Sequence, residues 1–190
     1  MEYYIIDGIS SEKDIWIIDT DYPTGIYDLI LEGRSFLKKL EGETIYMDYK
    51  LKNGRKTDWV NGIQSLDIIS EEFKSLIETE SIDLPFLEFY PVILRHKESV
   101  LNHNYYCLNV LESINAFDWE NSIYTIHEGT DVLDSVDKLV LDISKIGDRN
   151  IFRIGKIRPI LFVSEVLKKK IELASLTGLT FMKTEEFVKF

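Results

Sequence analysis

The sequence has a single cysteine, Cys107, and no uninterrupted apolar run that approaches the roughly 20 residues of a membrane-spanning helix. One cysteine excludes an intrachain disulfide and fits a reducing compartment. Residues 1–4 lack the basic segment before an apolar stretch that a secretory signal requires. We therefore expect a cytoplasmic protein.

The sequence also lacks the common motifs of catalysis and metal binding. It has no glycine-rich phosphate loop, no H-E-x-x-H or C-x-x-C pair and no G-x-S-x-G nucleophile elbow. His96, His103 and Cys107 lie close in sequence, but their spacing fits no structural zinc site and a fourth ligand is missing. Two loop histidines beside an ordinary buried cysteine are the favoured interpretation. We expect no active site, no metal and no cofactor.

Basic residues are scarce: 22 Lys and Arg stand against 33 Asp and Glu, which gives a net charge of −11. Such a body repels nucleic acid and anionic membranes and attracts cationic partners. The three lysines at 168–170 could form a phosphate-binding patch, but a solvated helix face is the favoured alternative. Neither a nucleic-acid partner nor a membrane partner is expected.

The most informative feature present is an internal repeat. Residues 44–78 align without a gap on residues 138–172, with eight identities in 35 pairs. The similarity extends to a tyrosine pair in each half, at 3–4 and at 105–106. Similarity between any two strand–helix units is the alternative explanation. We predict an α+β fold of two related lobes, 1–95 and 105–190, joined at 96–104 and packed as one compact unit.

Each lobe is predicted to be a small, mostly antiparallel sheet covered by a helix that a serine caps. Strands are expected at 3–6, 14–19, 44–50, 66–69, 86–94, 105–110, 160–163 and 179–182. Ser70 and Ser164 precede helical patterns and can accept from the free N–H groups of the first turn. Segment 26–40 is ambiguous because Gly33 interrupts any helix there.

One acidic stretch stands out as a candidate contact surface. Residues 112–142 contain eight acids against the single base Lys138, together with Phe117, Trp119 and Tyr124. Aromatic residues anchor interfaces, and surrounding acids steer a basic partner. A solvated loop, with Trp119 in the core, is the alternative. The candidate partner-binding residues are Asp118, Trp119, Glu120, Glu128, Asp131, Asp134 and Asp137.

Several short motifs occur in an order and spacing that resemble a known bacterial family. They are TDW at 57–59, IISE at 68–71, LEFYP at 87–91, YYCLNVL at 105–111, NAFDWENS at 115–122, NIFRI at 150–154, LFVSE at 161–165 and LTGLTF at 176–181. Over roughly residues 30–181 the chain resembles the immunity protein 11 family of bacterial polymorphic toxin systems.

That resemblance implies a cytosolic antidote that binds and neutralises a toxin encoded beside it, without catalysis or a cofactor. It transfers no toxin-contact residues. The positions that match the recurring pattern of the family are interpreted as structural: Asp118, Ser122, Phe152, Arg153, Ser164 and Gly178. Because Arg153 alternates with Phe152 along a strand, we expect it to pair with an acid such as Asp142. The alternatives are a cytoplasmic adaptor module with a different protein partner, and an enzyme that uses scattered carboxylates and a histidine.

Overall fold

The computed structural model describes residues 2–62, 66–80, 82–130, 132–157 and 159–188. Within these ranges the chain has an α+β fold with mostly antiparallel sheets, as the sequence predicts. The helices are α1 (Ile26–Leu31), α2 (Glu71–Thr79) and α3 (Glu165–Leu173). None of the helices described is long and apolar enough to cross a bilayer.

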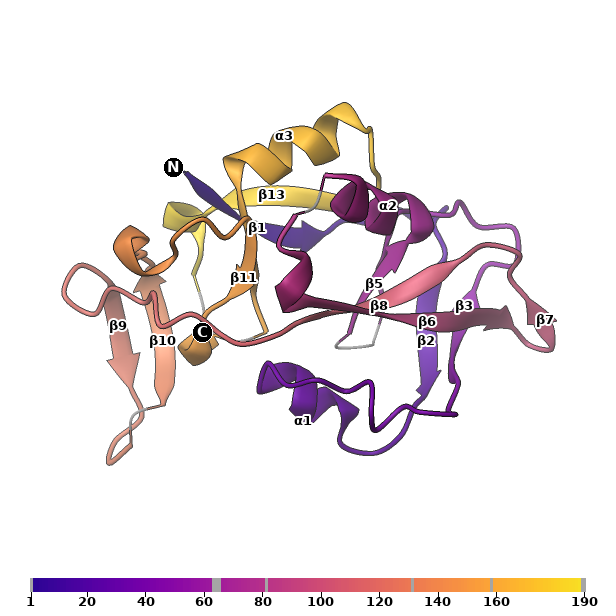
Figure 1. Ribbon diagram of the computed structural model, residues 1–190, viewed down its shortest axis with the longest axis horizontal. Helices are drawn as coiled ribbons and strands as arrows, with labels where there is room; N and C mark the ends of the chain where they lie inside the picture. Colours follow the sequence, from indigo (N-terminus) through magenta and orange to yellow (C-terminus); the bar gives the residue numbers. More distant parts are fainter. Residues whose placement is uncertain (1, 63–65, 81, 131, 158, 189–190) are drawn as a thin grey trace.

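A seven-stranded sheet forms the right-hand part of the molecule (Figure 1). Its order is β2-β3-β6-β8-β5-β4, with β7 paired to β6, and β3 and β6 run parallel. The strands are β2 (Trp16–Asp21), β3 (Ile45–Lys50), β4 (Trp59–Val60), β5 (Asp67–Ser70), β6 (Leu87–His96), β7 (Ser99–Val100) and β8 (Tyr105–Val110).

The other two sheets are smaller and wholly antiparallel. A four-stranded sheet has the order β11-β12-β1-β13, and a two-stranded sheet consists of β9 and β10. Their strands are β1 (Tyr3–Gly8), β9 (Ile123–Ile126), β10 (Leu133–Lys138), β11 (Ile151–Arg153), β12 (Leu161–Ser164) and β13 (Leu179–Lys183). Short 3-10 helices connect the elements: η1 (Leu84–Phe86), η2 (Ile143–Lys145), η3 (Gly155–Ile157) and η4 (Thr184–Glu186).

Both longer helices begin at a serine that follows a buried strand. The N–H of Phe73 donates to Ser70 Oγ at 3.1 Å, and the N–H of Leu167 donates to Ser164 Oγ at 3.2 Å. Each bond satisfies one of the N–H groups that a first helical turn leaves free. One apolar stripe on each helix then turns inward and is buried: Phe73 and Ile77 on α2, and Leu167 and Ile171 on α3.

Helices α2 and α3 each follow a strand in a four-strand unit, and the two units have the same strand order. In each unit one inner strand comes from the other half of the sequence. Strand β8 pairs with β5, with Tyr105 opposite Ser70, and β1 pairs with β12, with Tyr3 opposite Ser164. The orders β4-β5-β8-β6 and β11-β12-β1-β13 therefore correspond strand for strand. The tyrosine pairs noticed in the sequence occupy the exchanged strands.

Hydrogen bonds around the caps repeat this correspondence. Ser70 Oγ lies 2.8 Å from Asp58 Oδ1, and Ser164 Oγ lies 2.6 Å from Asn150 Oδ1. The carbonyl of Thr177, which follows α3, accepts the N–H groups of Asp58 and Trp59 in the first unit. In the second unit the N–H groups of Asn150 and Ile151 donate to the carboxylate of Asp83, which follows α2. The segment that follows each helix therefore accepts backbone hydrogen bonds from the other unit.

The repeat does not extend to its first residues. Residues 45–50 form β3, whereas the aligned residues 139–144 form only a bridge between Phe117 and Leu141 and the start of η2. The aligned segments differ because β3 pairs with β2 and β6, whereas residues 139–144 join none of the described sheets. The segment 26–40, left ambiguous by its sequence, contains the six-residue helix α1.

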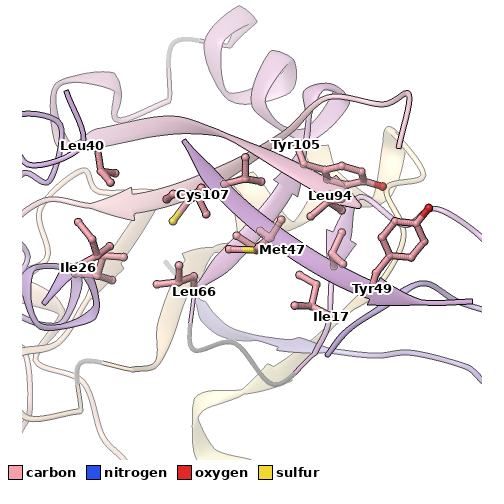
Figure 2. Close-up of a cluster of buried hydrophobic side chains, with 14 of the residues drawn as sticks. Ile17, Ile26, Leu40, Met47, Tyr49, Leu66, Leu94, Tyr105 and Cys107 are labelled. Atoms are coloured by element: carbon pink, nitrogen blue, oxygen red, sulfur yellow. The ribbon is translucent and has the colours of Figure 1, made fainter. Parts of the chain in front are cut away.

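Three groups of buried side chains hold the sheets and helices together. The first lies between the seven-stranded sheet and α1 and contains Ile17, Ile26, Met47 and Cys107 (Figure 2). Cys107 is fully buried there as a free thiol, as expected for a small apolar residue, and burial raises the pKa of that thiol. The second lies around α2 and α3, and the third beneath β1, β11 and β12.

Candidate partner-binding surface

The middle of the acidic stretch folds as a β-hairpin, formed by β9 and β10. Strands β9 and β10 lie at one end of the molecule, at the left in Figure 1, apart from the larger sheets. Leu133 and Val136 of β10 are buried against the third core group, which also contains Phe117. These contacts fix the inner face of the hairpin and leave its outer face to solvent. We call residues 118–138 the hairpin surface.

Asp118 organises the turn that leads into β9. Its carboxylate accepts the N–H groups of Glu120 and Asn121, each at 3.1 Å, and the side-chain amide of Asn121 at 2.8 Å. The bond from that amide is the main cause that lowers the pKa of Asp118. The Asp118 N–H donates to the carbonyl of Val140 at 3.0 Å. Asp118 therefore has a structural task, the role that the family resemblance implies.

Trp119 is half-buried and belongs to an aromatic cluster. Its ring centroid lies 4.6 Å from that of Phe117 and 5.1 Å from that of Tyr124, and Lys156 Nζ lies 5.8 Å from it. Edge-on and tilted rings at these distances attract each other. Trp119 thus joins the hairpin to the core, while part of its ring stays accessible. The sequence left open whether Trp119 anchors a partner or belongs to the core, and its position is compatible with both.

The remaining candidate acids are exposed. Glu120 lies in the turn before β9, Glu128 lies at the tip, and Asp134 and Asp137 lie on β10. None of the four has an ion-pair partner among the described residues. Asp131 lies outside the described residues. The hairpin therefore gathers unpaired negative charge from positions up to 17 residues apart in sequence.

Three exposed apolar residues of this surface were not predicted from the sequence. Ile123 is 56% exposed, Ile126 is 41% exposed and Val132 is 59% exposed. A signal for them was present: Ile123–Ile126 reads Ile-Tyr-Thr-Ile, a run of β-branched and aromatic residues, and Gly129 follows at a turn with φ of +76°. The many acids nearby directed attention to charge, and no strand was predicted at these residues.

The other candidate sites of the sequence do not assemble. His96 Nδ1 lies 2.9 Å from the carbonyl oxygen of Tyr49, His103 packs against Tyr105 near Glu72, and Cys107 is in the core. Among the described residues, no three His, Cys, Asp or Glu side chains are grouped as metal ligands.

The lysines on α3 bind neighbouring acids. Lys168 pairs with Glu172 at 2.8 Å, Lys169 with Glu165 at 2.6 Å, and Lys170 with Glu80. This arrangement fits the solvated helix face that the sequence analysis favoured over a phosphate-binding patch.

Arg153 is buried and forms an ion pair with the half-buried Asp67, so the expected pairing with an acid is confirmed, but the acid is not Asp142, the example named from the sequence. It also donates to the carbonyl of Pro159 at 2.9 Å. Asp142 instead caps η2 and pairs with Lys145 at 3.0 Å. The sequence did not indicate Asp67 as the partner, because Asp67 on β5 is far from Arg153 in sequence and only the packing of the two units brings them together. Burial raises the pKa of Asp67 in spite of the guanidinium.

A small crevice of about 260 Å³ lies beside Glu2, Tyr4 and Lys183. The bond from the Tyr4 hydroxyl to Glu2 is the main cause that raises the pKa of Tyr4 to about 12. A general acid or base works best with a pKa near the ambient pH. This shift moves the phenol away from that range, so the crevice offers no support for the enzyme alternative.

Comparison with known proteins identifies one family. A model described as Immunity protein family (Imm11) matches residues 10–186, nearly the whole chain. No curated protein matches the chain.

Proposed function

Because this chain belongs to the Imm11 immunity protein family, we propose that it binds and neutralises a cognate toxin of a bacterial polymorphic toxin system by direct contact. The observation that carries the proposal is the family match over residues 10–186. The proposal includes a cytoplasmic location and assigns the protein no catalytic step and no cofactor.

The hairpin surface is our candidate for the contact. It combines four exposed acids without described ion-pair partners and three exposed aliphatic side chains. Acids at the rim of an interface accelerate the approach of a cationic partner, whereas apolar side chains that lose water slow its departure. Both properties are needed by an antidote that must reach its toxin before the toxin reaches its target.

A basic toxin fits this surface best. A toxin that cleaves nucleic acid must hold phosphates with Lys and Arg, and an acidic antidote can occupy those groups in place of the substrate. The net charge of −11 supports this partner class and disfavours nucleic acid or an anionic membrane as the ligand.

The test is binding to the C-terminal domain of the toxin-type gene that lies beside this one, with its active site inactivated. We expect a stable one-to-one complex in size-exclusion chromatography and rescue of growth when both chains are co-expressed with the active toxin. Absence of both would reject the immunity function and favour an adaptor module with another partner.

We also propose that the scaffold of this surface is an internal duplication with lobes at 1–95 and 105–190 and a junction at 96–104. The matching strand orders and the corresponding caps support it. In the sequence, the hairpin lies between β8 and β11. The corresponding interval of the first half, between β1 and β4, contains β2, α1 and β3. The candidate contact is thus placed where the two halves differ.

A further inference from the structure

Strand β9 has an open edge. Within the described residues it pairs only with β10, so its second side has no neighbouring strand. An unpaired edge presents backbone N–H and C=O groups that can bind a further strand. Its sequence, Ile-Tyr-Thr-Ile, contains no charge, proline or glycine.

Other outer strands carry features that hinder such pairing. Strand β2 has an irregularity between Ile17 and Asp19 and ends in Asp21, β4 has two residues, and β11 has three, all buried. Strand β13 ends in Lys183, and β10 has two register shifts and three charged residues. Bulges, charges and short length are common means of protecting sheet edges. Strand β9 is short, with four residues, but it carries no charge and no extra residue in its pairing with β10.

The inner face of β9 is held firmly. The Tyr124 ring lies 5.5 Å from that of Phe117 and 5.1 Å from that of Trp119, and Tyr124 is opposite the buried Val136. On the outer face, Thr125 Oγ1 lies 2.9 Å from Ser135 Oγ. A strand fixed in this way loses little conformational freedom when a partner strand is added.

Charge indicates which strand can bind. Glu120 precedes β9, Glu128 follows it, and Asp134 and Asp137 lie on β10 beside it. A second copy of this chain would bring the same acids face to face, so self-pairing is disfavoured. The same four acids favour, as the partner of β9, a strand with Lys or Arg near its ends.

We propose that β9 binds an outer strand of the cognate toxin domain and extends the β9–β10 sheet, with basic residues of that strand facing Glu120 and Glu128. This inference rests on the proposed immunity function. Main-chain hydrogen bonds supply part of the affinity in such a complex, and alternate side chains supply specificity.

The test uses substitutions of Thr125, which is exposed in the middle of the edge. Thr125→Lys and Thr125→Glu each place a charge on the outer face of the edge strand, directly beside the side chains of an added strand, so we expect both to weaken binding of the inactivated toxin domain by about tenfold or more. Thr125→Val removes the bond to Ser135 but keeps an uncharged β-branched residue, and should bind within about twofold. Thr180→Lys on β13 is the matched edge control and should bind like the wild type.

The sign of the Thr125→Glu effect decides the matter. If only surface charge attracts the toxin, Glu at this position strengthens binding and only Lys weakens it, and the inference is wrong. Equal weakening by Thr125→Val would assign the effect to hairpin stability and also overturn it. In the complex, the amides of residues 123–126 should all become protected from hydrogen exchange. Failure of the wild-type protein to bind the toxin would instead reject the proposed function.

Discussion

Ser70 and Ser164 show how one side chain can direct a local structure. Each ends a buried strand, caps a nine-residue helix, and donates a hydrogen bond to a residue just before the neighbouring strand, Asp58 or Asn150. Because the hydroxyl serves both tasks, its loss affects the helix start and the strand contact together.

We predict that Ser164→Ala lowers the free energy of unfolding by about 1 kcal/mol, the usual cost of a lost N-cap. Denaturant unfolding measures this value from the shift in midpoint. Ser164→Thr, which keeps the hydroxyl, is the control and should retain most of the stability. An unchanged midpoint in Ser164→Ala would show that the cap contributes nothing.

The Asp67–Arg153 pair responds to pH in a direction set by burial. Because the pKa of Asp67 is raised in the folded protein, the folded state holds its proton to higher pH than the unfolded state does. Stability from this group is therefore fully present below its ordinary pKa and declines as pH rises through the raised pKa.

We predict that Arg153→Met costs about 3–5 kcal/mol at neutral pH, because it leaves the Asp67 carboxylate buried without its partner. The loss should be smaller at pH 5, where the carboxyl is more easily protonated. Thermal unfolding at both pH values checks this. Adding Asp67→Asn should recover part of the stability, and Arg34→Met in an exposed pair should change little. A loss that is independent of pH would contradict the assignment.

The β9–β10 hairpin has a buried face that packs on the core and an exposed face that carries negative charge. Its inner residues hold it to the third core group, and its outer residues are free for a partner. Substitutions on the two faces should therefore change different quantities.

We predict that Glu128→Gln, Asp131→Asn and Asp134→Asn together slow association with the toxin domain by about tenfold at low salt and flatten its salt dependence, because exposed acids act on encounter. Stopped-flow association at two ionic strengths measures both effects. The control, Glu12→Gln with Glu41→Gln and Glu98→Gln, makes the same change in net charge at exposed sites elsewhere. Equal slowing in both triples would mean that total charge acts and the hairpin location does not.

Trp119→Ala should act on dissociation and stability. Removing the half-buried ring breaks its contacts with Phe117 and Tyr124, so we expect the free energy of unfolding to fall by about 1–2 kcal/mol and the complex to dissociate faster. Denaturant unfolding and surface plasmon resonance measure the two effects. Trp16→Ala on β2 is the control for loss of a half-buried indole; it should leave the dissociation rate unchanged.

For the whole molecule, the exchange of β1 and β8 has the largest consequence. Each strand lies inside a sheet whose other strands come from the other half, apart from β7 in the junction, so neither half completes its own sheet. Folding should then be one cooperative transition, since separating the halves exposes two strand edges in each sheet.

We predict that fragments 1–95 and 105–190 are largely unfolded when produced separately and regain β-structure when mixed. Circular dichroism and size-exclusion chromatography of each fragment and of the mixture check this. A fragment 105–190 that folds alone with a cooperative transition would show that the lobes are independent and that the exchanged strands are dispensable.

The sequence by itself determined the elements that depend on near neighbours. Its apolar runs predicted most strands, and Ser70 and Ser164 predicted the starts of α2 and α3. The order of short motifs led to the immunity family that the family match supports. These features depend on side-chain chemistry within a few residues, which a sequence displays directly.

Only the tertiary structure decided which distant segments meet. It paired Tyr3 with Ser164 and Tyr105 with Ser70, exchanging the inner strands, and it joined Arg153 to Asp67 across 86 positions. It also turned an acidic stretch into a hairpin with an open edge. Such pairings are chosen by burial of apolar faces and completion of backbone hydrogen bonds over the whole chain, and local sequence patterns do not record that choice.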